Sequence, residues 1–358
     1  MKKFILEFSL LTLATLTAAC GNASGSEEVK GTIGISMPSK SLERWEKDGN
    51  NMVKEFEALG YETDIQYAQD EIQTQAAQIE NMVTKGVDAI IIAPIDGEVL
   101  SDSVNLADGQ GIPVVAYDRL IMNTDKVSYY ATFDNFTVGK LQGEYIAEHL
   151  NLKNEQGPFN IELFAGAPDD NNARFFFEGA MSVLQPYIDE GVLVVKSGQT
   201  DFATMAIDGW SSSIAQTRMD NLLTSSYTDN TKVDAVLAPN DAVAQGIVSS
   251  LKSMGYGDES RPMPVITGQD AEAASVKSII NEEQTMTVFK DTSKLAKITT
   301  QMVDAILKDE KPEVNDTETY DNNKKVIPTH LVDPVSVDVT NYQEILIDGG
   351  YLEESEVK

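Results

Sequence analysis

Short apolar runs alternate with amphipathic stretches along most of the chain. Residues 32–37 form the first apolar run, and residues 52–59 then carry apolar side chains at helical spacing until Gly60 ends the helix. Residues 89–93 are almost entirely apolar and are bounded by Pro94, which is typical of a strand buried on both faces of a sheet. Alternating strands and helices of this kind predict an α/β fold built on doubly wound parallel sheets.

The alternation begins a second time in the middle of the chain. After the strand predicted at 129–133, Asp134 and Asn135 mark a break, and a helix is predicted through residues 138–150. Further strands are predicted at 161–164, 192–195, 235–237, 265–267 and 285–289. We therefore expect two doubly wound lobes that face each other across a cleft. Ligands of such sheets bind beyond the carboxyl ends of the strands, so the residues that follow each strand are the candidates for a site.

The N-terminal segment has the organisation of an export signal. Two lysines precede an apolar stretch at 8–16, small residues occupy 17–19, and Cys20 is the only cysteine of the chain. A single cysteine cannot form an internal disulfide, and the apolar stretch is too short to span a membrane. The pattern resembles the signal of a bacterial lipoprotein, in which the cysteine becomes the lipidated first residue of the mature protein. We predict a signal peptide over 1–19 and a lipid-anchored tether over 20–30; an ordinary secretory signal is the alternative.

Composition and charge limit the function. The 358 residues are 42% hydrophobic and 23% charged, which is enough material for two folded domains. The formal net charge of -30 repels phosphate backbones and anionic headgroups. We therefore expect no nucleic-acid partner and contact with the membrane only through the lipid anchor. The predicted extracytoplasmic location also disfavours nucleotide cofactors, and no cofactor is expected.

Polar and charged side chains follow nearly every predicted strand. Asp118 and Arg119 follow the strand at 114–117, Asn240 follows the strand at 235–237, and Asp270 follows the strand at 265–267. Sugar hydroxyls both donate and accept hydrogen bonds, so carboxylates, amides and guanidinium groups can hold adjacent hydroxyls. The two tryptophans of the chain offer flat surfaces for the apolar face of a pyranose ring. The strand ends therefore indicate a sugar site.

Five of these strand-end motifs resemble those of the periplasmic aldose-binding proteins, and most closely those of the xylose-binding and multiple-sugar-binding receptors. The resemblance extends from about Lys30 to the C-terminus. The motifs are Leu-Glu-Arg-Trp at 42–45, Ala-Tyr-Asp-Arg at 116–119, Pro-Asp-Asp-Asn-Asn-Ala at 168–173, Ala-Pro-Asn-Asp at 238–241 and Gly-Gln-Asp-Ala at 268–271.

The resemblance implies the fold and mechanism of the type I periplasmic binding proteins, in which two lobes joined by a three-crossing hinge close on a sugar like a Venus flytrap. It also implies a monomer that delivers its sugar to the permease of an ABC importer and, in some cases, signals to a membrane sensor or chemoreceptor. The crossings are expected near Asp134–Asn135, Lys290–Asp291 and Lys324–Lys325. The N-terminal lobe would comprise 31–135 plus 291–324, and the C-terminal lobe 136–290 plus 325–358.

The residues of the sugar site follow from the matched motifs. The resemblance implies polar and aromatic contacts from Arg44, Trp45, Asp118, Arg119, Asn172, Trp210, Asn240, Asp270 and Lys290. A wider set near the same strand ends comprises Lys40, Asp170, Asn171, Arg174 and Gln269. Structural roles are the alternatives: an ion pair for Asp118 with Arg119, helix caps for Asn240 and Asp270, and a core position for Trp210. No structural metal is expected, because the calcium loop of galactose-binding relatives is not evident.

Other classes of function fit the sequence less well. An exported glycoside hydrolase could use Asp118 and Asp270 as acid and base, but neighbouring Arg, Asn and Gln residues would hold both carboxylates ionised. Neither histidine accompanies a nucleophile motif, so no catalytic residue is expected. A transcription regulator with the same lobes would need an N-terminal helix-turn-helix, where this chain has a leader. Xylose, glucose, galactose and arabinose all remain candidate ligands, and a furanosyl signal such as autoinducer-2 is a further alternative.

Overall fold

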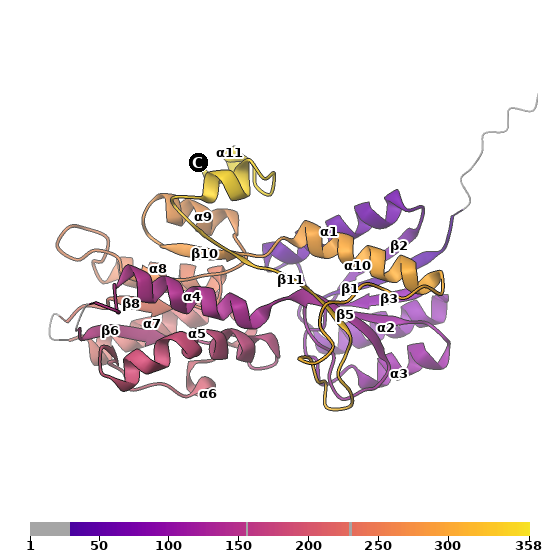
Figure 1. The fold of residues 1–358 in the computed structure, drawn as a ribbon, viewed down its shortest axis with the longest axis horizontal. Helices are drawn as coiled ribbons and strands as arrows, with labels where there is room; N and C mark the ends of the chain where they lie inside the picture. The colour runs from indigo at the N-terminus through magenta and orange to yellow at the C-terminus, as the bar shows by residue number, and fades with distance from the viewer. Residues whose placement is uncertain (1–28, 155–156, 229–230) are drawn as a thin grey trace, which may run out of the picture.

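The computed structural model describes residues 29–154, 157–228 and 231–358, which form two α/β lobes side by side (Figure 1). The predicted signal peptide, Cys20 and the tether up to residue 28 lie outside the described residues. No helix in the described part of the chain is long and apolar enough to cross a bilayer.

The N-terminal lobe is built on a six-stranded parallel sheet with the order β11-β5-β4-β3-β1-β2. Alternate residues of the central strand β3 enter two different cores, with Ile91 on the side of α1 and α10 and Ile90 on the side of α2 and α3. This two-sided burial explains why the strand is apolar throughout. The elements are β1 (Thr32–Met37), α1 (Glu43–Ala58), β2 (Glu62–Tyr67), α2 (Ile72–Lys85), β3 (Ala89–Ile92), α3 (Ser101–Gly109), β4 (Val114–Tyr117), β5 (Val127–Phe133), α10 (Thr292–Leu307) and β11 (Thr329–Val332).

The C-terminal lobe is built on a four-stranded parallel sheet with the order β7-β6-β8-β9. One of its cores lies against α7 and α8, and another against α4 and α5. The elements are α4 (Asn135–His149), β6 (Phe159–Leu163), α5 (Asn172–Asp189), β7 (Leu193–Val195), α6 (Phe202–Met205), a 3-10 turn at Asp208–Trp210, α7 (Ser212–Ser226), β8 (Ala235–Leu237), α8 (Asp241–Ser253), β9 (Val265–Ile266), α9 (Ala273–Ile280), β10 (Met286–Phe289), β12 (Val335–Asp338), a π-helical turn at Gln343–Ile347 and α11 (Glu354–Val357). The two-lobed, doubly wound architecture predicted from the sequence is confirmed.

The chain passes between the lobes three times, and the third passage differs from the prediction. The first two passages lie between β5 and α4 and between β10 and α10, and the third lies between β11 and β12. The sequence placed the third crossing near Lys324–Lys325 and assigned 325–358 to the C-terminal lobe. Instead, β11 pairs in parallel with β5, from Thr329 opposite Tyr130 to Val332 opposite Phe133. The strand therefore belongs to the N-terminal sheet, and the chain leaves that sheet only after Val332.

Glycines allow α4 and α5 to pack against each other with little space between their backbones. A Cβ atom on Gly139 would collide with the backbone oxygen of Phe176, and one on Gly179 would collide with that of Phe136. Rigid backbone atoms cannot yield as a flexible side chain can, so we expect Gly139→Ala to lower the free energy of unfolding by about 1–3 kcal/mol. Urea denaturation measures this change.

The control for this prediction is Gly109→Ala, at the end of α3. A Cβ atom there would meet nothing within 4 Å. Alanine has a higher helix propensity than glycine, so this variant should be as stable as the wild type or slightly more stable. Equal stabilities of the two variants would contradict the packing argument.

Candidate functional site

A narrow cavity of about 20 Å³ lies between the lobes, where the carboxyl ends of strands from both sheets converge. Its lining combines charged, amide and aromatic side chains from segments that are distant in sequence. The lining residues are Leu42, Arg44, Trp45, Asp118, Arg119, Asp170, Asn172, Phe176, Trp210, Asn240, Gln269, Asp270 and Lys290. The structure thus brings all nine principal residues expected from the motifs around one cavity, together with Asp170 and Gln269 of the wider set.

Three residues of the wider set do not line the cavity. Lys40 forms an exposed ion pair with Glu46 (Nζ to Oε1, 2.9 Å). Arg174 is exposed on α5, with its guanidinium over the ring of Phe202. Asn171 precedes the first turn of α5, and the inward-facing position in this turn is taken by Asn172. Proximity in sequence to a strand end was therefore not sufficient to place these side chains in the cavity.

Two apolar lining residues, Leu42 and Phe176, were not predicted. Phe176 lies four residues after Asn172 on α5, so the two side chains share one face of the helix. Leu42 is the residue at the N-terminus of α1 that precedes Glu43. Helical spacing from Asn172 was the signal that could have identified Phe176.

Arg44 is the central cation of the cavity and contacts three carboxylates. It lies in the first turn of α1, and its Nη2 donates to Asp118 Oδ2 (2.8 Å) and to Asp48 Oδ2 (2.9 Å). Its Nη1 lies 3.5 Å from Asp270 Oδ1. Burial opposes the charge of Arg44, but the three carboxylates outweigh burial and raise its pKa, so the guanidinium stays cationic.

Asp48 was not predicted and holds Arg44 from behind the cavity. Both Nε and Nη2 of Arg44 donate to Asp48 Oδ2, and the Tyr117 hydroxyl donates to Asp48 Oδ1. Burial raises the pKa of Asp48 to about 6, although Arg44 partly offsets this effect. The spacing of four residues between Arg44 and Asp48 on α1 is the usual spacing of a helical ion pair, and it was the available sequence signal.

Asp118 presents an ionised carboxylate from a constrained backbone. Its φ is +60°, and its carbonyl oxygen accepts hydrogen bonds from the Tyr130 hydroxyl, from Thr132 Oγ1 (2.7 Å) and from Asn172 Nδ2 (2.7 Å). Burial would raise the pKa of Asp118, but Arg44, Lys290 and Arg119 outweigh it and lower this pKa. The carboxylate is therefore a hydrogen-bond acceptor at neutral pH.

Four polar contacts join the two lobes at the cavity. Besides the Arg44–Asp270 pair, Arg119 Nε lies 2.9 Å from Asp170 Oδ2. Asn172 of α5 donates to the Asp118 carbonyl, and its Oδ1 accepts from the Tyr130 hydroxyl (3.3 Å). These contacts can exist only when the lobes are close together. The structure is therefore a closed arrangement, and the same groups become available when the lobes separate.

Asn240 and Asp270 differ with respect to the helix-cap alternative. The side-chain oxygen of Asn240 accepts from Val243 N (3.0 Å) and caps α8, which leaves its amide nitrogen as the part that can serve a ligand. Asp270 caps no described helix; its Oδ1 lies 2.9 Å from Lys290 Nζ. Its φ of +96° is sparsely populated by residues other than glycine. Asn240 therefore combines both roles, whereas the Asp270 carboxylate faces cations.

The two tryptophans lie at different parts of the cavity wall. The guanidinium groups of Arg44 and Arg119 lie over the Trp45 ring, with Cζ 4.4 and 5.2 Å from its centroid. Trp210 contacts Phe176 edge to face (6.2 Å between centroids) and lies directly against Gly166, where a Cβ atom would collide with the indole. Trp210 also belongs to a hydrophobic cluster, so it combines the core position given as the alternative with a place in the cavity lining.

Two lining side chains carry buried polar atoms that have neither a hydrogen-bond partner nor an ion-pair partner among the described residues. They are the donor Trp210 Nε1 and the acceptor Gln269 Oε1, whereas Arg119 Nε and Asp270 Oδ1, which also lack a hydrogen bond, have ion-pair partners. Buried polar atoms in native proteins are nearly always paired, so unpaired atoms at a cavity indicate an absent ligand or water. No cluster of metal-ligating side chains occurs within the described ranges.

The family model for the periplasmic binding protein domain matches residues 33–311. The chain belongs to this family. It is 55% identical over 348 residues to the multiple sugar-binding periplasmic protein SbpA of Azospirillum brasilense, covering 97% of each chain. It is 54% identical to the multiple sugar-binding periplasmic receptor ChvE of Rhizobium radiobacter (98% of this chain, 99% of that one). It is 38% identical to the D-xylose-binding periplasmic protein of Escherichia coli (97% and 98%).

Solved structures of relatives have the same fold. A solute-binding protein of an ABC transporter from Clostridium phytofermentans, with bound beta-D-glucose, superposes with a TM-score of 0.88 at 51% identity and covers 91% of this chain and 100% of its own. A carbohydrate transporter solute-binding protein from Chloroflexus aurantiacus, in complex with D-glucose, has a TM-score of 0.82 at 34% identity (90% and 97%). The family resemblance and fold class predicted from the sequence are confirmed.

Proposed function

We propose that this protein is an extracytoplasmic receptor that encloses one monosaccharide between its lobes and delivers it to an ABC importer. The observation that carries the proposal is the cavity, which offers an unpaired donor and an unpaired acceptor beside the ionised carboxylate of Asp118, as sugar hydroxyls require. Multiple-sugar and xylose receptors among the relatives support the same class of function. The class predicted from the sequence is thus confirmed, and the identity of the sugar stays open.

Residues of both lobes face the cavity, so a bound sugar would contact both lobes at once. Closure brings Arg44 and Asp118 of one lobe towards Asp270 and Lys290 of the other. A ligand can drive this closure only through contacts that it makes in the closed state and not in the open one.

A thermal-shift panel of monosaccharides on the purified protein tests the proposal. Glucose, xylose, galactose and arabinose are the first ligands, and autoinducer-2 represents the signalling alternative. A ligand at 100 times its Kd should stabilise the protein by about 2.7 kcal/mol. If no aldose raises the melting temperature but autoinducer-2 does, the receptor serves a different ligand class. If none of these compounds does, the monosaccharide proposal fails.

We infer a binding role without catalysis. The relatives are sugar-binding transport receptors. Arg44 and Lys290 pair with Asp118 and Asp270 and hold them as acceptors, whereas a hydrolase needs one protonated carboxyl. Oligosaccharides incubated with the protein should therefore yield no hydrolysis products in chromatography, and their appearance would favour the glycoside hydrolase.

The proposed receptor is monomeric and is anchored to the membrane by a lipid on Cys20. Its proposed partners are the permease of an importer and a membrane sensor or chemoreceptor. The observation that supports the anchor is the position of the only cysteine at the end of the predicted export signal. Cys20→Ser should release the protein from the membrane fraction and leave the sugar affinity of the folded lobes unchanged. A variant that still partitions into detergent would contradict lipidation.

A further inference from the structure

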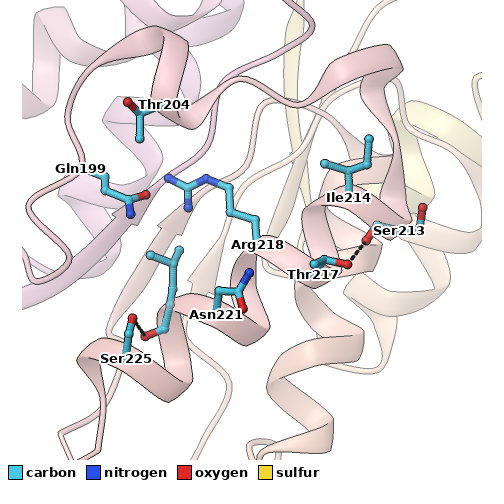
Figure 2. Close-up of a pocket in the computed structure, with 9 residues that line it drawn as sticks. Gln199, Thr204, Ser213, Ile214, Thr217, Arg218, Asn221 and Ser225 are labelled. Atoms are coloured by element: carbon cyan, nitrogen blue, oxygen red, sulfur yellow. Dashed lines mark hydrogen bonds between the residues drawn. The ribbon is translucent and has the colours of Figure 1, made fainter.

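A second hollow lies on the C-terminal lobe, between α7 on one side and α6 with the segment that precedes it on the other. Its volume is about 490 Å³, and it shares no lining residue with the cavity between the lobes. Most of its lining consists of hydroxyl and amide side chains, with Arg218 at its centre (Figure 2). These polar side chains are Gln199, Thr204, Ser213, Thr217, Asn221 and Ser225.

The Arg218 guanidinium extends from α7 into the hollow between Gln199 and Thr204 (Figure 2). Its Nη2 donates to the Leu163 carbonyl (3.2 Å), and its Cζ lies 4.5 Å from the ring centroid of Phe164. Its Nε and Nη1 are buried and have no hydrogen-bond partner within the described part of the chain. A cation with unused donors thus lies on the floor of a polar hollow, which is unusual because buried donors are normally paired.

No carboxylate neutralises this cation by direct contact among the described residues. Glu162 is near enough to favour the charge, but it accepts from Ser197 N, Ser197 Oγ and the Tyr227 hydroxyl and forms no ion pair with Arg218. None of the residues that line the hollow is acidic, in a chain whose net charge is -30. The lining of the hollow therefore lacks the negatively charged side chains that predominate in the rest of the chain.

We propose that this hollow is a second ligand site that takes a small hydroxylated oxyanion, such as a sugar acid or sugar phosphate. Arg218 binds the carboxylate or phosphate group, because guanidinium donors match the geometry of these oxyanions. The surrounding hydroxyl and amide groups bind the hydroxyls of the ligand. The site is separate from the sugar cavity, so this inference does not rest on the proposed function.

Calorimetric titration with D-gluconate, D-glucose 6-phosphate and inorganic phosphate tests the proposal. We expect gluconate or glucose 6-phosphate to bind more tightly than inorganic phosphate, and Arg218→Gln to weaken this binding by about tenfold or more. The matched control is Arg261→Gln, which removes another arginine that lies over an aromatic ring, that of Tyr256, and donates to the Met254 carbonyl, but does not line the hollow. This control should bind like the wild type.

The titrations are repeated with a saturating concentration of the monosaccharide that raises the melting temperature most, so that binding in the cavity between the lobes is not counted. Thermal melts show whether Arg218→Gln is folded; if it is not, Thr217→Val and Asn221→Leu, which remove polar groups of the lining, replace it. Equal affinity of wild type and folded variants for the oxyanions would overturn the proposal, as would absence of binding at millimolar concentration. Binding of inorganic phosphate alone would overturn the hydroxylated ligand class.

Discussion

Asp270→Asn should weaken monosaccharide binding by roughly ten- to 150-fold, which corresponds to about 1.5–3 kcal/mol for a hydrogen bond to a charged group. The Asp270 carboxylate is 6% exposed, and its Oδ1 lies between Lys290 Nζ (2.9 Å) and Arg44 Nη1 (3.5 Å). The amide that replaces it carries no charge and turns one acceptor into a donor, so it serves both the cations and a sugar hydroxyl less well. Isothermal titration calorimetry with the sugar that raises the melting temperature most gives the change in Kd.

The fold should tolerate this change, because asparagine accepts a positive φ at least as readily as aspartate. Asp309→Asn is the matched control, since Asp309 also has a positive φ (+58°) but is exposed and does not line the cavity. It should bind sugar like the wild type. A destabilised Asp270→Asn with unchanged Kd would show that Asp270 has a structural role and does not contact the ligand.

Much of this architecture could be predicted from the sequence, because strands buried on both faces and helices with one apolar face leave clear patterns. The strand β3 and the helix α2, which ends at Gly86 with a φ of +74°, are examples. The strand β11 illustrates the limit. Its partner β5 lies about 200 residues earlier in the chain, and this pairing has no local signature, so the third crossing was placed too early.

The site shows the same division between local and distant information. The predicted strand ends and the matched motifs indicated which residues meet at the cavity, since the carboxyl ends of parallel strands share one edge of a sheet. The sequence did not reveal that Arg44 would bind Asp48, Asp118 and Asp270 together, because this requires the relative position of a helix and both lobes. The sequence placed Asn172 above Asn171 only through the family motif, because which of the two faces the cavity depends on the rotation of α5 about its axis.

The largest loss of stability is expected from Arg44→Met, which removes the cation shared by these carboxylates. Breaking a buried ion pair by removing one partner typically costs about 3–5 kcal/mol, because the remaining charge is buried without compensation. Asp48 is fully buried and Asp118 is 4% exposed, so both would be left in this state. Sugar binding should be lost as well. Urea denaturation at neutral pH measures the change in the free energy of unfolding.

The pH dependence of the free energy of unfolding of Arg44→Met distinguishes the loss of a charge from the loss of a packing contact. In the wild type the pKa of Asp118 is lowered, so its contribution to stability is lost only as the pH falls below the ordinary range of an aspartate. The pKa of Asp48 is raised to about 6, so its buried charge costs stability as the pH rises from about 4 to 6. Without Arg44 both pKa values should rise, because the cation that favours the ionised forms is gone. Lowering the pH from about 7.5 to 5.5 should therefore stabilise Arg44→Met more than the wild type and narrow the difference between them.

Arg44→Lys is the matched control, because lysine retains the positive charge but lacks the guanidinium fork that reaches Asp48 and Asp118 together. Its free energy of unfolding should be larger than that of Arg44→Met and should depend on pH much as that of the wild type does. It should still bind sugar more weakly than the wild type. If the stability deficit of Arg44→Met stays constant over this pH range, Arg44 stabilises the fold by packing against the Trp45 ring, and the charge argument is wrong. If instead the deficit shrinks only in the methionine variant, the three carboxylates depend on the charge of Arg44, and a sugar entering the cavity meets a site already organised around that charge.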